Sequence, residues 1–207
     1  MDYDLKSLVK LEKNRLNDAA QVFSRAFIDD PLIKWFFPEM SSREQLSLSY
    51  FRFRIMYGLL YGEVYATSHN LEGLAVWIPS KNTKMTNLKM MRSGGFRLMK
   101  NLGFELIGKL ISVSNFVSNI HHRLVNYPHW HLSPMGVAPE YQGKGYGSIL
   151  MRSMLKKLDE ENLPCFLETQ NKENVEIYQH YGFEVIDLTS IPNSDLKHWS
   201  MLRNSPK

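Results

Sequence analysis

A glycine-rich turn between a strand-like and a helix-like segment is the feature that most constrains this chain. Gly143, Gly145 and Gly147 alternate with other residues between Gln142 and Ser148. The apolar residues that follow have helical spacing: Ile149, Leu150, Met154, Leu155 and Leu158. Unpaired N–H groups and the dipole at such a helix start bind anions, and glycines let a phosphate approach the main chain. The turn predicts a diphosphate site, although a tight connection without a ligand explains the glycines equally well.

Two common nucleotide-binding loops do not match this turn. A P-loop requires Gly-x-x-x-x-Gly-Lys-Ser/Thr, but Lys144 is followed by Gly145. A dinucleotide loop requires Gly-x-Gly-x-x-Gly, and the alternating glycines have the wrong spacing. The residues around the turn must therefore decide its function.

The segments before the turn predict helices and a β-hairpin. Apolar spacing predicts a helix over residues 14–28, which Asp29-Asp30-Pro31 ends. Ser41-Ser42-Arg43-Glu44 resembles a capping box that opens a second helix to about residue 58. Residues 64–67 and 74–78 predict a hairpin. Residues 82–125 predict two or three helical pieces separated by glycines.

After Pro128 the pattern predicts a strand, the glycine turn, a helix, a strand at 165–169 and a helix at 171–181. Two further strands are expected at 183–188 and 198–203. The chain shows no internal repeat or linker, so we expect residues 1–207 to form a single domain.

Composition narrows the class of protein. The chain has 207 residues, a net charge of +4 and a single cysteine, so neither an internal disulfide nor a multi-cysteine metal site can form. The basic residues form neither a stripe nor a known nucleic-acid-binding motif, and we therefore expect no nucleic-acid partner. No apolar run approaches the roughly 18 residues of a membrane span, and no signal peptide is visible. We therefore expect a cytoplasmic protein with no membrane partner.

Two blocks of sequence carry a resemblance to a known family. Met135-Gly136-Val137-Ala138-Pro139-Glu140-Tyr141 and the glycine turn resemble the core motif of the GNAT acetyltransferases. Leu163–Thr169, Asn171 and Tyr178-x-x-x-Gly182-Phe183 resemble the family's next strand and helix. Trp199–Arg203, together with Phe166–Thr169, is similar to the puromycin-type branch of the family. The resemblance is strong over residues 127–203, weaker over 15–80 and without a motif over 82–125.

The resemblance implies an α/β (α+β) GNAT fold, with a mixed, mostly antiparallel sheet of about six or seven strands. Helices would flank this sheet, which would be splayed at the cofactor strand. It also implies transfer of an acetyl group from acetyl-CoA, without a metal, to a primary amine of a small molecule. An inactive CoA-binding sensor and a protein or peptide N-acetyltransferase stay open as alternatives, and the sequence allows a homodimer.

The resemblance assigns the cofactor to the strand, the turn and the following helix. The main chain of Met135, Gly136 and Val137 would pair with the pantetheine arm, with the Val137 N–H as donor to the reacting carbonyl oxygen. Asn171 would also bind this arm. The pyrophosphate would lie on the amides of the turn, which are those of Gln142, Gly143, Lys144, Gly145, Tyr146, Gly147 and Ser148. Ser133-Pro134 removes a ladder donor from the strand, which favours pairing with the cofactor.

Three residues are candidates for acid–base chemistry. An ammonium acceptor must lose a proton before it attacks a thioester. His131, six residues before Val137, is one candidate base, and Glu168 on the next strand is the other. The resemblance implies that Tyr178 protonates the departing thiolate, and its seven-residue distance from Asn171 predicts that both project from one helix face. Structural roles in the strands and the core explain all three residues without catalysis.

The resemblance implies an acceptor site formed by the first two helices, the loop between them and the last strand pair. Asp29 and Asp30 would attract a cationic amine, and Trp35 would contribute an aromatic wall. A helix stop and a core aromatic cluster explain the same residues. Cys165 is expected to be a buried strand residue rather than an acyl-accepting nucleophile.

Overall fold

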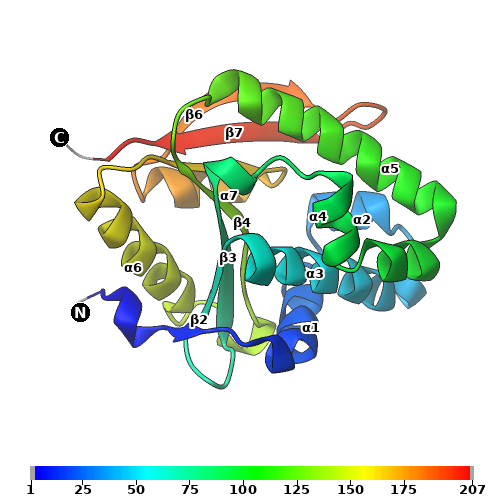
Figure 1. Ribbon diagram of the computed structural model, residues 1–207, viewed down its shortest axis with the longest axis horizontal. Coiled ribbons are helices and arrows are strands. Elements are labelled where there is room, and N and C mark those ends of the chain that lie inside the picture. The colour runs from blue at the N-terminus through cyan, green and yellow to red at the C-terminus, as the bar shows by residue number, and fades with distance from the viewer. Residues whose placement is uncertain (1–2, 206–207) are drawn as a thin grey trace.

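A seven-stranded sheet runs through the computed structural model, which describes residues 3–205 (Figure 1). Its strand order is β1-β2-β3-β4-β5-β7-β6, and only the β4–β5 pair is parallel. The expectation of a mixed, mostly antiparallel sheet of six or seven strands is confirmed. The strands are β1 (Val9–Lys10), β2 (Glu63–Ala66), β3 (Gly73–Pro79), β4 (Trp130–Val137), β5 (Cys165–Thr169), β6 (Glu184–Ser190) and β7 (Lys197–Arg203).

Helices cover both faces of the sheet (Figure 1). They are α1 (Leu16–Ala26), α2 (Pro31–Phe36), α3 (Met40–Tyr61), α4 (Asn87–Arg92), α5 (Gly95–Leu124), α6 (Tyr146–Glu160) and α7 (Lys172–Gln179). Short 3-10 turns lie at Leu5–Ser7, Lys13–Arg15, Ser80–Asn82 and Pro139–Tyr141. Gly94 separates α4 from α5, and Gly103 interrupts α5, with φ values of +93° and +78° that favour glycine. Among the described helices, none is both long and apolar enough to cross a membrane.

Strand β3 divides two layers of core. Its even-numbered residues Leu74, Val76 and Ile78 belong to the core formed with α1 and α3. Its odd-numbered residues Ala75 and Trp77 belong to the core formed with α6. Because both faces are buried, the strand reads in the sequence as a continuous apolar run rather than as an alternating one.

Aromatic side chains join α1 to α3. The ring centroids of Phe23 and Phe51 lie 5.6 Å apart, and those of Phe27 and Phe51 lie 5.1 Å apart. The hydroxyl groups of Ser24 and Ser47 are hydrogen-bonded at 2.7 Å between the same helices. This pair of helices covers β2 to β4, whereas the end of α5 packs on β5 through the stacked rings of His121 and Phe166, 4.1 Å apart.

Two local expectations before β2 are wrong. The capping box does not form, because α3 begins at Met40 and Ser42 already lies inside its first turn. Arg43 instead fixes this corner, donating from a buried guanidinium to the carbonyl oxygens of Phe37 at 2.8 Å and Pro38 at 2.6 Å. The sequence reading also missed α2, for which Asp30 is the N-cap.

We expect Gly136→Ala to destabilise the fold, because α1 packs directly on this glycine. A Cβ atom at Gly136 would lie 2.8 Å from the Phe27 ring and 3.2 Å from Ala26. Overpacking of this kind costs about 1–3 kcal/mol, which urea denaturation measures. Gly108→Ala on α5 is the control, since a Cβ atom there meets nothing within 4 Å. The control should be neutral or slightly stabilising, and an equal effect of both changes would contradict the packing argument.

Candidate active site

The parallel strands β4 and β5 separate after three paired residues. Trp130, His131 and Leu132 pair with Cys165–Leu167. Beyond this point the remainder of β4 pairs with β3 only, and Glu168 pairs with β7 only. The expected splay at the cofactor strand is therefore present, and Glu168 is the first β5 residue past the point of separation.

A bulge accompanies the separation. Between the Ala75–Met135 and Trp77–Leu132 pairs, one residue of β3 lies opposite two residues of β4. The extra residue falls at Ser133-Pro134, where proline offers no N–H to a ladder. Bulges bend the strand that carries them, and they are frequent beside active sites.

The free edge of β4 presents main-chain donors to the gap. The Ala138 N–H donates to Glu72 of the β3 side, and Gly136 is paired with Leu74. Because the hydrogen bonds of an antiparallel strand alternate between its two sides, the Met135 and Val137 N–H groups point away from β3. Two of the three strand residues predicted to contact the cofactor thus offer amides to the gap.

The glycine turn leads directly into α6. Gly143 and Gly145 have φ values of +73° and +86°, and a Cβ atom at either would meet nothing within 4 Å. Among the described residues, no side chain caps the first turn of α6. The amides of Tyr146, Gly147 and Ser148 at this helix start therefore suit a diphosphate.

Two side chains of the turn fold back on the protein. The Gln142 side-chain amide donates to the Val137 carbonyl at 3.1 Å, and Lys144 donates to the Glu140 carbonyl at 2.9 Å. Glu140 also forms an ion pair with Arg25 of α1. These contacts fix the turn against β4 and α1 through side chains of the turn rather than through its main-chain amides. The Ser148 hydroxyl accepts from Arg152 at 3.1 Å.

The two candidate bases lie together where the strands separate. His131 Nε2 is 3.5 Å from Glu168 Oε2, and both side chains are largely buried, at 13% and 11% exposure. Burial raises the pKa of Glu168 to about 7, although the His198 and Arg54 charges oppose this rise. Burial, aided by the Arg54 charge, lowers the pKa of His131 to about 3. Near neutral pH His131 is uncharged, and the Glu168 carboxyl exchanges its proton readily.

Tyr178 occupies the opposite face of the sheet from this pair. Its ring lies in the α6-side core, with its centroid 6.0 Å from that of Phe183. Burial raises the pKa of its hydroxyl, and the nearby Asp30 carboxylate raises it further. The phenol therefore stays protonated at neutral pH, as a proton donor must.

The sequence profile of the acetyltransferase (GNAT) family matches residues 77–183, which is more than half of the chain. The protein belongs to the GNAT acetyltransferase family. It is an acetyltransferase, and enzymes of this family use acetyl-CoA.

Relatives agree with this assignment. An uncharacterised N-acetyltransferase of Schizosaccharomyces pombe is 25% identical over 84% of this chain and 72% of its own length. The structure of a histone acetyltransferase HPA2-related protein from Corynebacterium glutamicum has a TM-score of 0.67 at 16% identity, with 97% and 96% of the chains covered. That of a putative arylalkylamine N-acetyltransferase 7 from Aedes aegypti has a TM-score of 0.65 at 12% identity, covering 96% and 87%. The two structural likenesses show the GNAT fold.

In this GNAT acetyltransferase, Asn171 does not lie inside the helix where the sequence predicted it. It is the N-cap of α7 rather than a helical residue, and its Oδ1 accepts from the Glu173 N–H at 3.0 Å. The prediction that Asn171 and Tyr178 project from one helix face is therefore wrong. The side chain oxygen of Asn171 is occupied by capping, and its assignment to the cofactor stays a prediction.

The three predicted acceptor residues lie in different surroundings. Asp30 is partly buried and caps α2, accepting from Leu32 at 2.9 Å; burial raises its pKa. Asp29 is 75% exposed and lies 3.8 Å from Lys34. Trp35 is covered by Lys109, whose Nζ lies 3.6 Å from the ring centroid. Asp30 alone of the three acts electrostatically on Tyr178.

Two residues close to the candidate active site were not predicted from the sequence. His198 on β7 is completely buried, and its Nε2 faces Glu168 Oε1 at 3.8 Å. The Gln170 amide, at 2.7 Å, donates to His198 Nδ1, which leaves the imidazole proton on Nε2, towards Glu168. Arg54 on α3 donates to the Ser133 hydroxyl beside the bulge. No local pattern marks either residue, because strand pairing and helix packing bring them in.

Cys165 lies on β5 with its thiol completely buried, and burial raises its pKa. The thiolate needed for a nucleophile is disfavoured there. This agrees with the expectation of a structural cysteine.

We expect Glu168→Gln to change the pH dependence of stability. The folded pKa of about 7 exceeds the unfolded value of 4.5. The stability contributed by proton uptake is thus present below pH 4.5 and lost as the pH rises through 7, by roughly 3 kcal/mol. Glutamine removes this loss, so the variant should gain stability over the parent at pH 8 relative to pH 4.5. Unfolding free energies at both values measure it, and exposed Glu176→Gln is the control.

Proposed function

We propose that this protein transfers the acetyl group of acetyl-CoA to a primary amine of a small molecule by direct transfer. The observation that carries the proposal is the gap between β4 and β5. Main-chain donors of Met135 and Val137 face it, and the Glu168 carboxyl lies where it begins. A thioester held by those donors would have a proton acceptor beside its carbonyl carbon.

The glycine turn and the gap suit the two halves of acetyl-CoA. The uncapped start of α6 would hold the pyrophosphate on the amides of Tyr146–Ser148, and the free edge of β4 would hold the pantetheine arm. When bound, acetyl-CoA supplies an activated acyl group.

Glu168 is the proposed base. It accepts the proton that the acceptor ammonium must lose, and its pKa of about 7 suits proton acceptance near neutral pH. His131 is uncharged, contacts the same carboxylate and orients it. His198 Nε2 faces the other carboxylate oxygen at 3.8 Å, which is beyond hydrogen-bond distance, and favours the ionised carboxylate electrostatically.

Tyr178 is the proposed acid. Its hydroxyl, kept protonated by burial, donates a proton to the sulfur of the leaving group, and the Val137 N–H stabilises charge on the reacting carbonyl oxygen. Asp30, close to Tyr178, is the proposed contact for a cationic acceptor, whereas Asp29 and Trp35 have partners elsewhere.

Calorimetric titration with acetyl-CoA, followed by a thiol-release assay over a panel of small amines and peptides, tests the function. Binding with turnover on a small amine is the expected result. Binding without turnover on any amine would favour the inactive sensor, and turnover on peptides alone would favour a protein N-acetyltransferase.

Tyr178→Phe should lower the maximal rate of thiol release by about 100-fold and leave acetyl-CoA affinity nearly unchanged. Only the hydroxyl is lost, while the ring keeps its contact with Phe183. Tyr181→Phe, three residues further along the chain, is the matched control and should retain the rate. Unchanged turnover in Tyr178→Phe would remove this residue from the mechanism.

The rate should also rise with pH around 7, as Glu168 ionises. His198→Leu removes the imidazole that favours the carboxylate electrostatically, so the midpoint of the kcat/KM profile should move to higher pH. His198→Gln can supply an N–H donor and should restore the midpoint in part. A profile that is identical in all three proteins would exclude His198 as a positioning residue.

A further inference from the structure

Basic residues are concentrated in one short segment. Residues 81–109 contain seven lysines and arginines and one acidic residue, Glu105, although the whole chain carries only +4. This segment comprises α4 and the first part of α5. Lys89 and Lys109 lie over the rings of Tyr61 and Trp35. The exposed basic residues are Lys81, Lys84, Arg92, Arg97 and Lys100.

Large apolar side chains protrude from the same segment. Leu88 is 61% exposed, Met91 50%, Phe96 63% and Phe104 83%. Leu88 and Met91 share one face of α4 at a spacing of three residues. The buried side of this part of α5 is formed by other residues, Leu98 and Leu102. The four protruding side chains therefore do not pack in the hydrophobic core.

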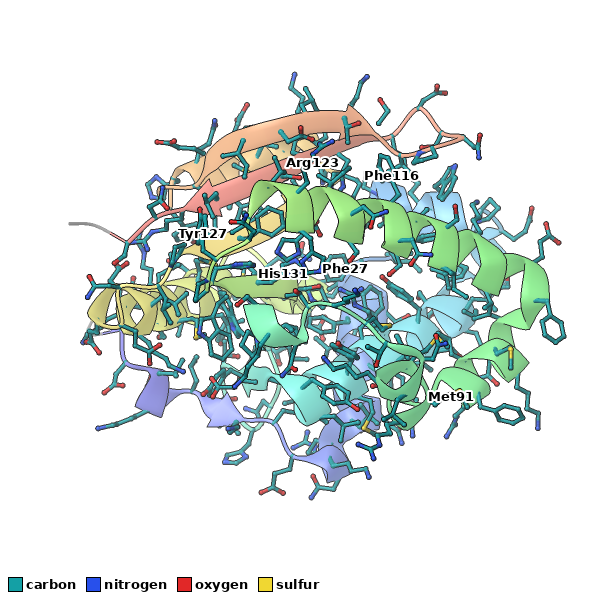
Figure 2. All side chains as sticks on the ribbon, turned by 45° about the horizontal axis from the view of Figure 1, so that its top comes forward. Phe27, Met91, Phe116, Arg123, Tyr127 and His131 are labelled. Atoms are coloured by element: carbon teal, nitrogen blue, oxygen red, sulfur yellow. The ribbon has the colours of Figure 1, made fainter. Side chains whose placement is uncertain are left out.

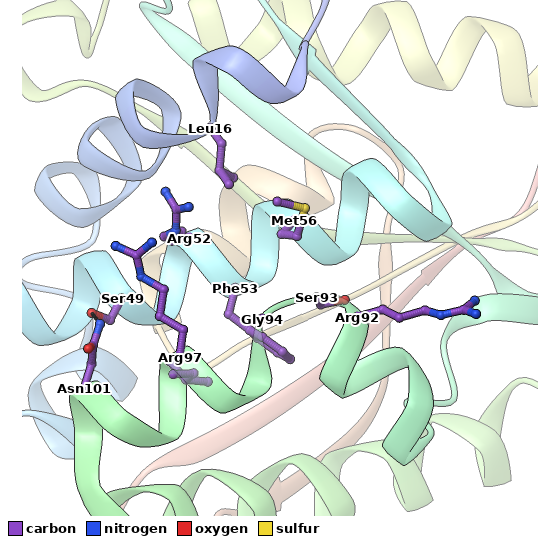
Figure 3. A pocket seen from close by; sticks show the side chains of 11 residues that line it. Leu16, Ser49, Arg52, Phe53, Met56, Arg92, Ser93, Gly94, Arg97 and Asn101 are labelled. Atoms are coloured by element: carbon purple, nitrogen blue, oxygen red, sulfur yellow. Dashed lines mark hydrogen bonds between the residues drawn. The ribbon is translucent and has the colours of Figure 1, made fainter.

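An arginine-lined cavity opens beside this segment, between α3 and the start of α5 (Figure 3). Its volume is about 110 Å³. Arg52 and Arg97 extend together towards α1 at one side of it, whereas Arg92 points away (Figure 3). Its other polar lining residues are Ser49, Ser93 and Asn101.

The two arginines lack a compensating charge. Burial and the neighbouring Arg97 charge lower the pKa of Arg52. Within residues 3–205, neither guanidinium forms an ion pair with a carboxylate. Two forked donors facing one small cavity match the geometry of a phosphate group.

Charge and shape favour a lipid surface over other occupants. A symmetric contact with a second copy would bring two strongly basic segments together and is opposed by repulsion. Protein interfaces are depleted in lysine, and a nucleic-acid duplex, whose base faces are already stacked, would leave Phe96 and Phe104 without an apolar partner. Basic clusters with protruding aromatic residues are typical of helices that lie on anionic membranes.

We propose that α4 and the start of α5 dock on an anionic phospholipid surface, with a headgroup phosphate between Arg52 and Arg97. Phe96 and Phe104 enter the boundary between headgroups and acyl chains. The inference goes beyond acetyl transfer and does not depend on it. It departs from the expectation of no membrane partner, which rested on the lack of a long apolar run. Figure 2 shows Met91, in this segment, toward the lower right of the view and His131 of the candidate active site near its centre.

Co-sedimentation of the full chain with vesicles tests the proposal. Phosphatidylcholine vesicles are compared with vesicles that also contain about 30% phosphatidylserine, an anionic lipid. We expect binding to the anionic vesicles only, weakening as salt screens the charges. Equal binding to both vesicles, or to neither, would overturn the proposal.

Paired variants separate charge from apolar contact. Arg92→Glu with Arg97→Glu should lower anionic-vesicle affinity by at least about tenfold, and Phe96→Ser with Phe104→Ser should lower it to a similar extent. Lys6→Glu with Lys13→Glu makes the same change in net charge elsewhere, and Val185→Ser with Leu188→Ser removes exposed apolar groups from β6. Both controls should bind as the parent does. Melting curves confirm that each variant is folded.

Arg52→Lys tests the headgroup site, because lysine keeps the charge but loses the forked donors. We expect a several-fold loss of binding to anionic vesicles. If the Arg92→Glu/Arg97→Glu and Phe96→Ser/Phe104→Ser variants both bound vesicles as the wild type does, the docking surface would be excluded. Stabilisation by inorganic phosphate without vesicle binding, or dimerisation through the segment in analytical ultracentrifugation, would overturn the lipid as occupant.

Discussion

The separation of β4 from β5 is the constraint on which the rest of this structure depends. A buried strand edge needs hydrogen-bond partners, and here the pairing of β4 with β5 ends at Leu132 and Leu167. The bulge at Ser133-Pro134 turns the strand away, and Gly136 lets α1 pack against the diverging part. Glu168 lies on one face of the sheet where the strands separate, and Tyr178 lies on the other face. In the proposed mechanism both residues act on one bound acetyl-CoA.

A single physical cause sets the protonation of the groups around this gap. Burial disfavours charge, and it therefore raises the pKa of Glu168 and Tyr178 and lowers that of His131. The result is a carboxyl that titrates near neutral pH beside an uncharged imidazole, and a phenol that keeps its proton. His198 and Arg54 moderate the effect on Glu168 from β7 and α3. The acid–base properties of the site are thus a consequence of its packing.

The basic residues of the molecule are concentrated in one segment. The basic segment at α4 and the start of α5 lies toward one end of the long axis, and α6 lies toward the other (Figure 1). The break at Gly103 and the left-handed Gly94 divide this segment into short helices whose outer sides carry Phe96 and Phe104. A docking surface at that end would leave the glycine turn at the start of α6 accessible to its cofactor.

Local patterns in the sequence determined the hairpin of β2 and β3, the glycine turn, α6 and the order of the later strands, because periodicity and glycine chemistry act over a few residues. The resemblance to the GNAT acetyltransferases, rather than local periodicity, indicated His131, Glu168 and Tyr178. Only the tertiary structure decided that His198 and Arg54 join Glu168, that Lys109 covers Trp35 and that Asp30 caps α2. Strand register, bulge position and the docking of α5 bring together residues far apart in the chain. No local pattern encodes those distances, since they follow from how the whole core packs.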